Sequence, residues 1–155
     1  MKSEMSTDLR FLDACAADGC SPDLALFVDA ARAHALLTLK RRGTPLVPLV
    51  MYRQAKQIGL RDFPAATFTK AAADAQAFIQ TLPEEVDACA LVMDSYLAAD
   101  PAGQKKTDAI VIEACQRGQS ASFRFAQRYG HSGILRRLKP SAPFEYLGTC
   151  APLLV

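Results

Sequence analysis

The sequence lacks most of the patterns from which a reaction is usually inferred. It contains no tryptophan and only two histidines, His34 and His131. With so few histidines, the residues cannot supply the Cys/His spacing of a structural zinc site. No glycine-rich phosphate loop, nucleophile elbow or dinucleotide fingerprint is present. We therefore expect no bound metal, no cofactor and no catalytic residue, and we favour a protein without enzyme activity.

Long apolar runs are missing as well. No window reaches the roughly 18 apolar residues that a membrane-spanning helix needs. The most apolar segment, residues 44–52, is interrupted by Pro45 and Pro48. The first residues carry charges where a secretory signal would have its apolar stretch. These absences predict a soluble cytoplasmic protein with no membrane partner.

The five cysteines show no recognisable framework. Their number is odd and their spacing is irregular, at positions 15, 20, 89, 115 and 150. Disulfide-rich small domains instead have paired cysteines and an export signal. We expect reduced thiols that behave as small, buried apolar side chains.

Apolar side chains are abundant. Half of the 155 residues are hydrophobic and 22% are charged, which is ordinary for a globular protein. The length fits a single domain over residues 1–155. The net charge of +2 is too small to require a polyanionic partner for the molecule as a whole.

The first half of the chain has the pattern of helices. Residues 6–18 begin with hydroxyl side chains that suit a helix cap. The segment 21–43 is the clearest helix, because Ser21 suits its N-cap, a proline follows, and Gly43 suits its end. Its apolar residues recur at helical spacing, which predicts an amphipathic helix.

Two further segments follow. Residues 64–81 are rich in alanine and carry one apolar stripe, which predicts another helix. Residues 46–58 are ambiguous, since so short an apolar run shows no clear period. We favour a helix that begins at Pro48, and a short strand over 46–52 is the alternative.

The pattern changes after residue 86 to short apolar or alternating segments that suit strands. These segments are residues 87–99, 107–116, 119–129 and 144–154. Only Arg117 and Gly118 separate the second from the third, which predicts a tight hairpin. The glycine- and proline-containing segment 130–143 is expected to be the longest loop.

The order of these segments predicts the fold class. Helices occupy about residues 6–81, and strands occupy about residues 87–154. Such an order favours an α+β fold with an antiparallel meander rather than a parallel sheet. We expect three or four N-terminal helices, packed on one face of a sheet of about four strands.

Acidic residues near the predicted hairpin suggest one reaction. Asp108 and Glu113, with Asp94 on the preceding strand, resemble over a short stretch the acids of the PD-(D/E)XK nucleases. This resemblance implies a metal-dependent hydrolase. It fails at Cys115, where the nuclease pattern has a lysine. The odd offset between Asp108 and Glu113 also directs their side chains to opposite faces of one strand, so they cannot share an ion.

Both acids also have ordinary structural roles. Asp108 can form hydrogen bonds at the start of a strand. A turn at 117–118 pairs Glu113 with position 122, which places Arg124 diagonally opposite and within reach of an ion pair. We prefer this structural interpretation to the catalytic one.

Basic residues give the clearest candidate surface. No acid lies between Glu113 and Glu145, whereas Arg117, Arg124, Arg128, Arg136, Arg137 and Lys139 all do. A basic strand face that continues into a basic loop can follow a nucleic-acid backbone. A solvated strand face that discourages aggregation explains the same residues. The candidate binding residues are Arg124, Arg128, Tyr129, His131, Arg136 and Arg137.

No motif in the sequence identifies the function. Our first hypothesis is a non-enzymatic domain that binds a protein partner or a second copy of itself. It rests on strand 108–115, which is apolar on both faces, and on the apolar ending CAPLLV. The alternative is a nucleic-acid-binding protein that uses the basic face and loop 117–139. A metal-dependent hydrolase is the third.

Overall fold

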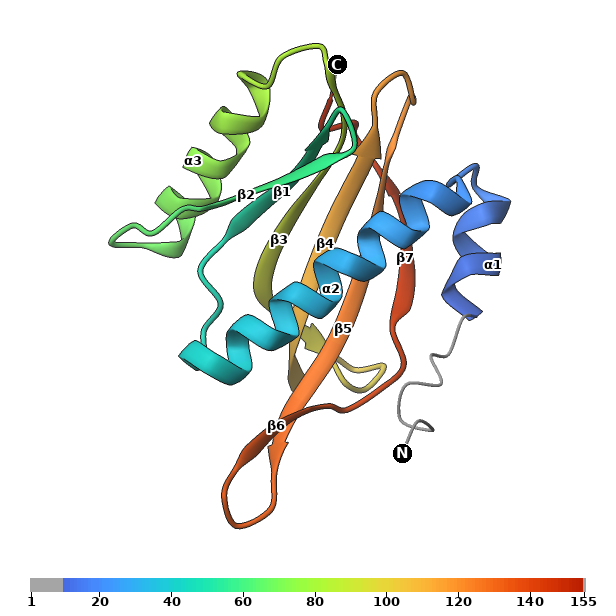
Figure 1. Ribbon diagram of the computed structural model, residues 1–155. Helices are drawn as coiled ribbons and strands as arrows, with labels where there is room; N and C mark the ends of the chain where they lie inside the picture. The colour runs from blue at the N-terminus through green and yellow to red at the C-terminus, as the bar shows by residue number, and fades with distance from the viewer. Residues whose placement is uncertain (1–9, 155) are drawn as a thin grey trace.

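Figure 1 shows a computed structural model, which describes residues 10–154. Over this range the chain is an α+β protein with three helices and one curled, seven-stranded antiparallel sheet that resembles half a barrel. The elements are α1 (Arg10–Ala17), α2 (Pro22–Arg42), β1 (Leu49–Gln54), β2 (Gln57–Asp62), α3 (Phe68–Gln80), β3 (Val86–Ala98), β4 (Lys106–Gln116), β5 (Ser122–Ser132), β6 (Arg137–Pro140) and β7 (Glu145–Cys150). None of these helices is both long and apolar enough to cross a bilayer.

Helix α2 forms where its end signals place it. The Ser21 side chain accepts a hydrogen bond of 3.0 Å from the Leu24 N–H, and a proline occupies the first helical position. At the other end Gly43 has a φ of 84°, and its N–H donates to the Leu39 carbonyl. The predicted helix over 21–43 is confirmed. The helix predicted over 6–18 is α1 within the described residues, and positions 6–9 lie outside them.

The preferred helix, from Pro48 through residue 58, is wrong, because this region forms the β1–β2 hairpin. Strand β1 lies between β2 and β3 and is covered on both faces, with Val50 in one apolar cluster and Met51 in the other. A strand that is buried on both faces has a continuous run of apolar residues. It therefore lacks the alternation of apolar and polar residues by which a strand is usually predicted. The rejected alternative, a strand over 46–52, overlaps most of β1.

The expected sheet of about four strands is also wrong. The observed order is β2-β1-β3-β4-β5-β6, and β7 pairs with β5 as well. The β1–β2 hairpin adds two strands beside β3. At the other edge β5 is long enough to pair with β7 along residues 122–126 and with β6 along residues 129–132. Strand β6 therefore occupies part of the segment that was expected to be a loop. The central β3-β4-β5 meander matches the prediction.

Helices cover both faces of the sheet, not one as expected. Helices α1 and α2 pack on the face we call the α2 face, and α3 packs on the opposite, α3 face. Alternate residues of β3 explain this, since Ala90 and Val92 contribute to the α2 cluster, whereas Cys89 and Leu91 contribute to the α3 cluster. Strand β4 is buried on both faces in the same way, and Leu154 near the C-terminus joins the α3 cluster.

The β4–β5 hairpin differs in register from the prediction. Glu113 lies directly opposite Arg124, instead of diagonal to it, because the connecting loop is longer than two residues. The predicted ion pair is present, with 3.4 Å between Arg124 Nε and Glu113 Oε1. A directly opposite pair on neighbouring strands is the closer of the two arrangements.

The β1–β2 turn generates a prediction about stability. Gln54 pairs with Gln57, and the two residues between them, Ala55 and Lys56, have positive φ angles of 52° and 68°. Such two-residue turns favour Asn-Gly. A positive φ strains most residues that have a Cβ, whereas asparagine tolerates it and glycine has no Cβ. The double substitution Ala55→Asn/Lys56→Gly should stabilise the protein by about 1 kcal/mol in urea unfolding.

The matched control for this substitution is Lys106→Gly, a glycine introduced at an exposed strand residue. It should destabilise the protein, because glycine loses more backbone entropy on folding than lysine does and relieves no strain at this position. An unchanged or lower stability of the Asn-Gly variant would contradict the turn geometry.

The cysteines generate a second prediction. All five are free thiols, four of them buried and Cys150 only half-buried. Burial raises the pKa of Cys20 and of Cys89 to about 12, so neither forms the reactive thiolate at neutral pH. We expect a disulfide reagent to label one thiol in the native protein, and Cys150→Ser to remove that reaction. Rapid labelling of several thiols before unfolding would contradict this burial.

Candidate ligand-binding site

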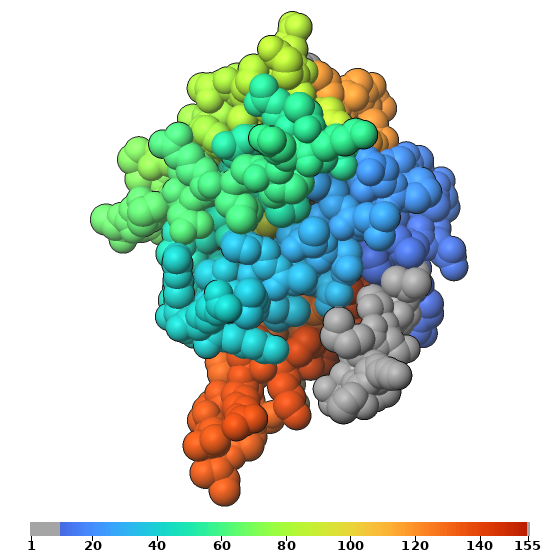
Figure 2. Space-filling view, in the orientation of Figure 1, coloured from blue at the N-terminus to red at the C-terminus, as the bar shows by residue number. Residues whose placement is uncertain are grey.

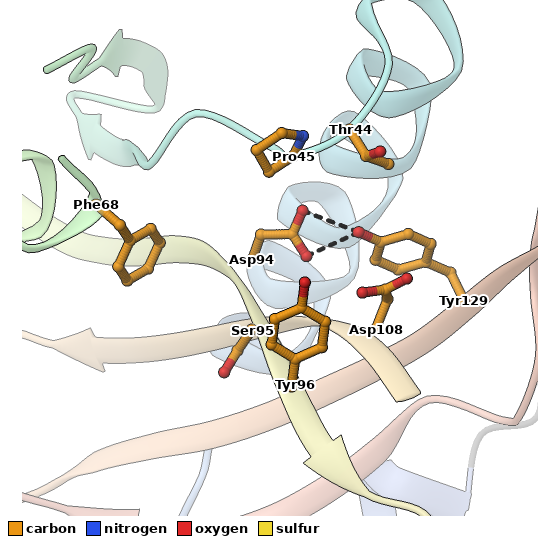
Figure 3. A pocket seen from close by; sticks show the side chains of 8 residues that line it. All are labelled: Thr44, Pro45, Phe68, Asp94, Ser95, Tyr96, Asp108 and Tyr129. Carbon is orange, nitrogen blue, oxygen red and sulfur yellow. Dashed lines mark hydrogen bonds between the residues drawn. The ribbon is translucent and has the colours of Figure 1, made fainter. Parts of the chain in front are cut away.

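A pocket of about 500 Å³ lies just past the C-terminal end of α2, on the α2 face of the sheet (Figure 3). Under the helix, this face of β3 and β4 carries apolar residues such as Val92 and Ile110. Two residues further along each strand, the same face carries Asp94 on β3 and Asp108 on β4. The lining residues are Thr44, Pro45, Phe68, Asp94, Ser95, Tyr96, Asp108 and Tyr129.

Asp94 is the most constrained of these side chains. The hydroxyl of Tyr129 donates to its carboxylate and lies 2.8 Å from each oxygen (Figure 3). The backbone N–H of Leu46, in the segment that follows α2, donates to Oδ2 at 2.8 Å. Two separate parts of the chain, β5 and the segment that follows α2, thus hold this half-buried carboxylate of β3 in a fixed orientation.

The pocket also perturbs the acidity of this pair. Burial raises the pKa of Asp94, and the negative charge of Asp108 acts in the same direction, against the hydrogen bonds from Leu46 and Tyr129. Burial and the hydrogen bond to Asp94 likewise raise the pKa of Tyr129. Tyr129 therefore stays protonated and donates to Asp94, while burial disfavours the charged form of Asp94.

The remaining lining residues add aromatic surface and a second acid. Asp108 lies directly opposite Tyr96 on the neighbouring strand. The Tyr96 side chain is 70% exposed and Phe68, the first residue of α3, is 51% exposed, so both rings present open faces at the mouth. None of the eight lining residues carries a positive charge. The site combines negative charge with exposed aromatic rings.

The three acids singled out in the sequence are divided by the fold. Asp94 and Asp108 line the same pocket, whereas Glu113 faces away from it and borders a different hollow next to Cys150. The prediction that Asp108 and Glu113 point to opposite faces is confirmed. Within residues 10–154, no three His, Cys, Asp or Glu side chains gather as ligands for a metal ion.

The six candidate binding residues do not form one surface. Arg124 and Arg128 lie on the α3 face, where each is within ion-pair distance of a glutamate, at 3.4 Å from Glu113 and 2.9 Å from Glu145. Arg128 also donates to the Ala98 carbonyl and the Thr107 hydroxyl. Tyr129 belongs to the acidic pocket. His131, Arg136 and Arg137 lie together on the β5–β6 hairpin, along a separate groove.

Sequence reasoning did not select Thr44, Pro45, Phe68 or Tyr96 as site residues. They come from three segments that only the fold brings together, so no local spacing connects them. One signal was available in β3, where the residues that alternate on the α2 face change from alanine and valine to Asp94 and Tyr96. Such a change marks the point where the apolar cover of a sheet face ends.

Comparisons of this chain with protein-family models, with curated proteins and with solved structures find no match. The function is therefore inferred from the geometry and charge of the pocket.

The raised pKa of Asp94 generates a prediction about stability and pH. Because the folded state favours the protonated form, Asp94 contributes most to stability below the pKa of the unfolded chain, and this contribution is lost as pH rises through its folded pKa. Asp94→Asn removes the titration. The free energy of unfolding of the wild type, minus that of the variant, should fall as the pH is raised from about 4, the ordinary pKa of an aspartate in an unfolded chain.

Urea unfolding of both proteins across this pH range measures the difference. Asp62→Asn is the matched control, because Asp62 is an exposed strand residue outside the pocket. A difference for Asp94→Asn that stays constant, or that grows as pH rises, would contradict the burial of an unfavourable charge.

Proposed function

We propose that this chain binds a small organic cation in the pocket formed by Asp94, Asp108 and the surrounding aromatic rings. The observation that supports this most directly is that two carboxylates face one cavity whose lining contains no positive side chain. Asp108 is one cause of the raised pKa of Asp94, and neither carboxylate has a counter-ion among the residues that line the pocket. A positively charged ligand supplies that counter-ion.

The aromatic residues favour an organic cation over a bare metal ion. A cation over the face of a Tyr or Phe ring gains about 0.5–2 kcal/mol, depending on how well water is excluded. Tyr96 and Phe68 have such faces open at the mouth of the pocket. Hard metal ions gain little from these rings and usually require more oxygen ligands than two aspartates provide.

The size of the cavity narrows the ligand further. Pockets for small ligands commonly range over about 300–1,000 Å³, and this one, at about 500 Å³, lies in the lower part. A primary amine or guanidinium group attached to a compact apolar body fits the arrangement. The charged group lies against Asp94 and Asp108, and the apolar body lies between the rings of Phe68 and Tyr96.

The other functions considered for this chain stay predictions. The features that motivated a protein partner or self-association have roles within the chain, because β4 is covered on both faces and Leu154 is buried in the α3 cluster. The arginines proposed for nucleic acid are divided between ion pairs on the α3 face and the β5–β6 hairpin. The two acids of the pocket, in contrast, have no positive side chain among the residues that line it.

Three ligands of one shape and different charge test the proposal. Benzylammonium, benzyl alcohol and benzoate should be titrated into the protein while amide chemical shifts are followed by NMR. We expect benzylammonium to bind most tightly and to shift the amides around Asp94 and Tyr96. Its affinity should rise with pH as Asp94 ionises. Equal affinity for the cation and the neutral alcohol would refute the proposal.

Substitutions locate the binding site. Asp94→Asn and Asp108→Asn should each weaken benzylammonium binding about tenfold, which corresponds to about 1.4 kcal/mol. Glu113→Gln is the matched control, because it removes an acid of the same region that faces away from the pocket. Equal weakening by all three substitutions would indicate a general charge effect and contradict a specific site.

A further inference from the structure

A hairpin arm projects from the body of the molecule. It consists of the outer end of β5, the turn over residues 133–136 and strand β6. Tyr129 pairs with Pro140 at its base, and Ser132 pairs with Arg137 at its outer end. The arm extends beyond the sheet and beyond α2 in Figure 1, and it forms the lower projection in Figure 2. A flat partner that approaches this end of the molecule would therefore contact the apex of the arm first.

The apex carries aliphatic side chains that contact little of the protein. Ile134 is 100% exposed and Leu135 is 72% exposed, which makes them the two most exposed large apolar residues in the part of the chain described. The turn that presents them is closed by a hydrogen bond of 3.1 Å from the Arg136 N–H to the Gly133 carbonyl. Adjacent exposed aliphatic residues at the tip of a projection are typical of a docking element.

The residues next to the apex are basic. Arg136, Arg137 and Lys139 follow the apolar pair, and no described acidic side chain forms an ion pair with any of them. A groove of about 1030 Å³ separates the arm from the end of α2, and Lys40 and His131 also line it. These features together favour a partner that is negatively charged and offers an apolar environment to the tip.

We propose that the arm docks the protein on the surface of an anionic lipid bilayer. Ile134 and Leu135 enter the boundary between headgroups and acyl chains, and the basic residues behind them contact lipid phosphates. This arrangement, with apolar side chains leading and cations following, matches the layers of a bilayer surface. We expected no membrane partner from the sequence, because no segment could span a bilayer; docking on the surface does not need a spanning segment.

Nucleic acid and an acidic protein fit these observations less well. Binding to single-stranded nucleic acid commonly uses stacking on Phe, Tyr or Trp, and the one such residue of the arm, Tyr129, is turned inward to donate a hydrogen bond to Asp94. An acidic protein segment would satisfy the cations from within the groove, but would leave Ile134, the fully exposed residue at the apex, in water. A bilayer accounts for both the charge and the apolar apex.

Vesicle co-sedimentation of the full chain tests this inference. Vesicles of phosphatidylcholine alone are compared with vesicles that also contain phosphatidylglycerol, at physiological ionic strength. We expect binding only to the anionic vesicles. The pair Ile134→Ser/Leu135→Ser should weaken it at least tenfold. Arg136→Ser/Arg137→Ser should weaken it about 25-fold, since each cation near an anionic surface is worth about fivefold.

Controls of the same chemistry are available elsewhere on the chain. Leu26→Ser removes an exposed leucine of α2, and Lys56→Gln removes an exposed lysine of the β1–β2 turn, at the far end of the sheet from the arm. Both variants should bind vesicles as the wild type does. Circular dichroism of every variant establishes that the fold is intact.

Several outcomes would overturn the proposal. It is wrong if anionic vesicles bind no protein, or if the arm variants bind as the control variants do. It is also wrong if duplex DNA or polyglutamate displaces the protein from vesicles and binds the Ile134→Ser/Leu135→Ser variant as tightly as the wild type. That last result would identify a partner that recognises only charge.

Discussion

The architecture depends on the need to cover both faces of the central strands. Strands β3 and β4 carry apolar side chains on both faces of the sheet. In β3, for example, Val92 must be covered on one face and Leu91 on the other. Helix α2 supplies the first cover, and α3 together with the C-terminal residues supplies the second. Water would otherwise contact apolar surface on both sides, at a cost of about 25 cal/mol per Å². The position and length of α2 therefore determine how much of the sheet is sealed.

The candidate site follows from the point where this cover ends. Helix α2 stops at Gly43, whereas β3, β4 and β5 continue past it. Their exposed continuation carries Asp94, Asp108 and Tyr129 on the face that the helix no longer covers. The same strands that provide a rigid apolar core thus hold polar groups in a fixed arrangement a few residues further on. A site built on strands in this way holds its side chains more precisely than one built on loops.

The sequence predicted elements that have local signals and missed those that depend on contacts between distant segments. Helix α2 was predictable from Ser21 and Gly43, and the Glu113–Arg124 pair was predictable from strand alternation. The β1–β2 hairpin was not, because β1 is buried on both faces and the turn at Ala55 lacks the usual asparagine and glycine. The ion pair between Arg128 and Glu145 was not predictable, because it joins β5 to β7 and the pairing of these two strands has no local signal. The pocket was unpredictable because its residues come from five separate segments.

The proposed function depends on a half-buried carboxylate, that of Asp94, which has no counter-ion among the residues lining its pocket. The most direct test is a titration of the Asp94 side-chain carboxyl, followed by its ¹³C chemical shift in the NMR spectrum. We expect a pKa above the ordinary aspartate value of about 3.9. This pKa should fall in Asp108→Asn and fall again when benzylammonium is added. An ordinary pKa for Asp94 that neither change alters would show that the pocket does not hold an uncompensated carboxylate.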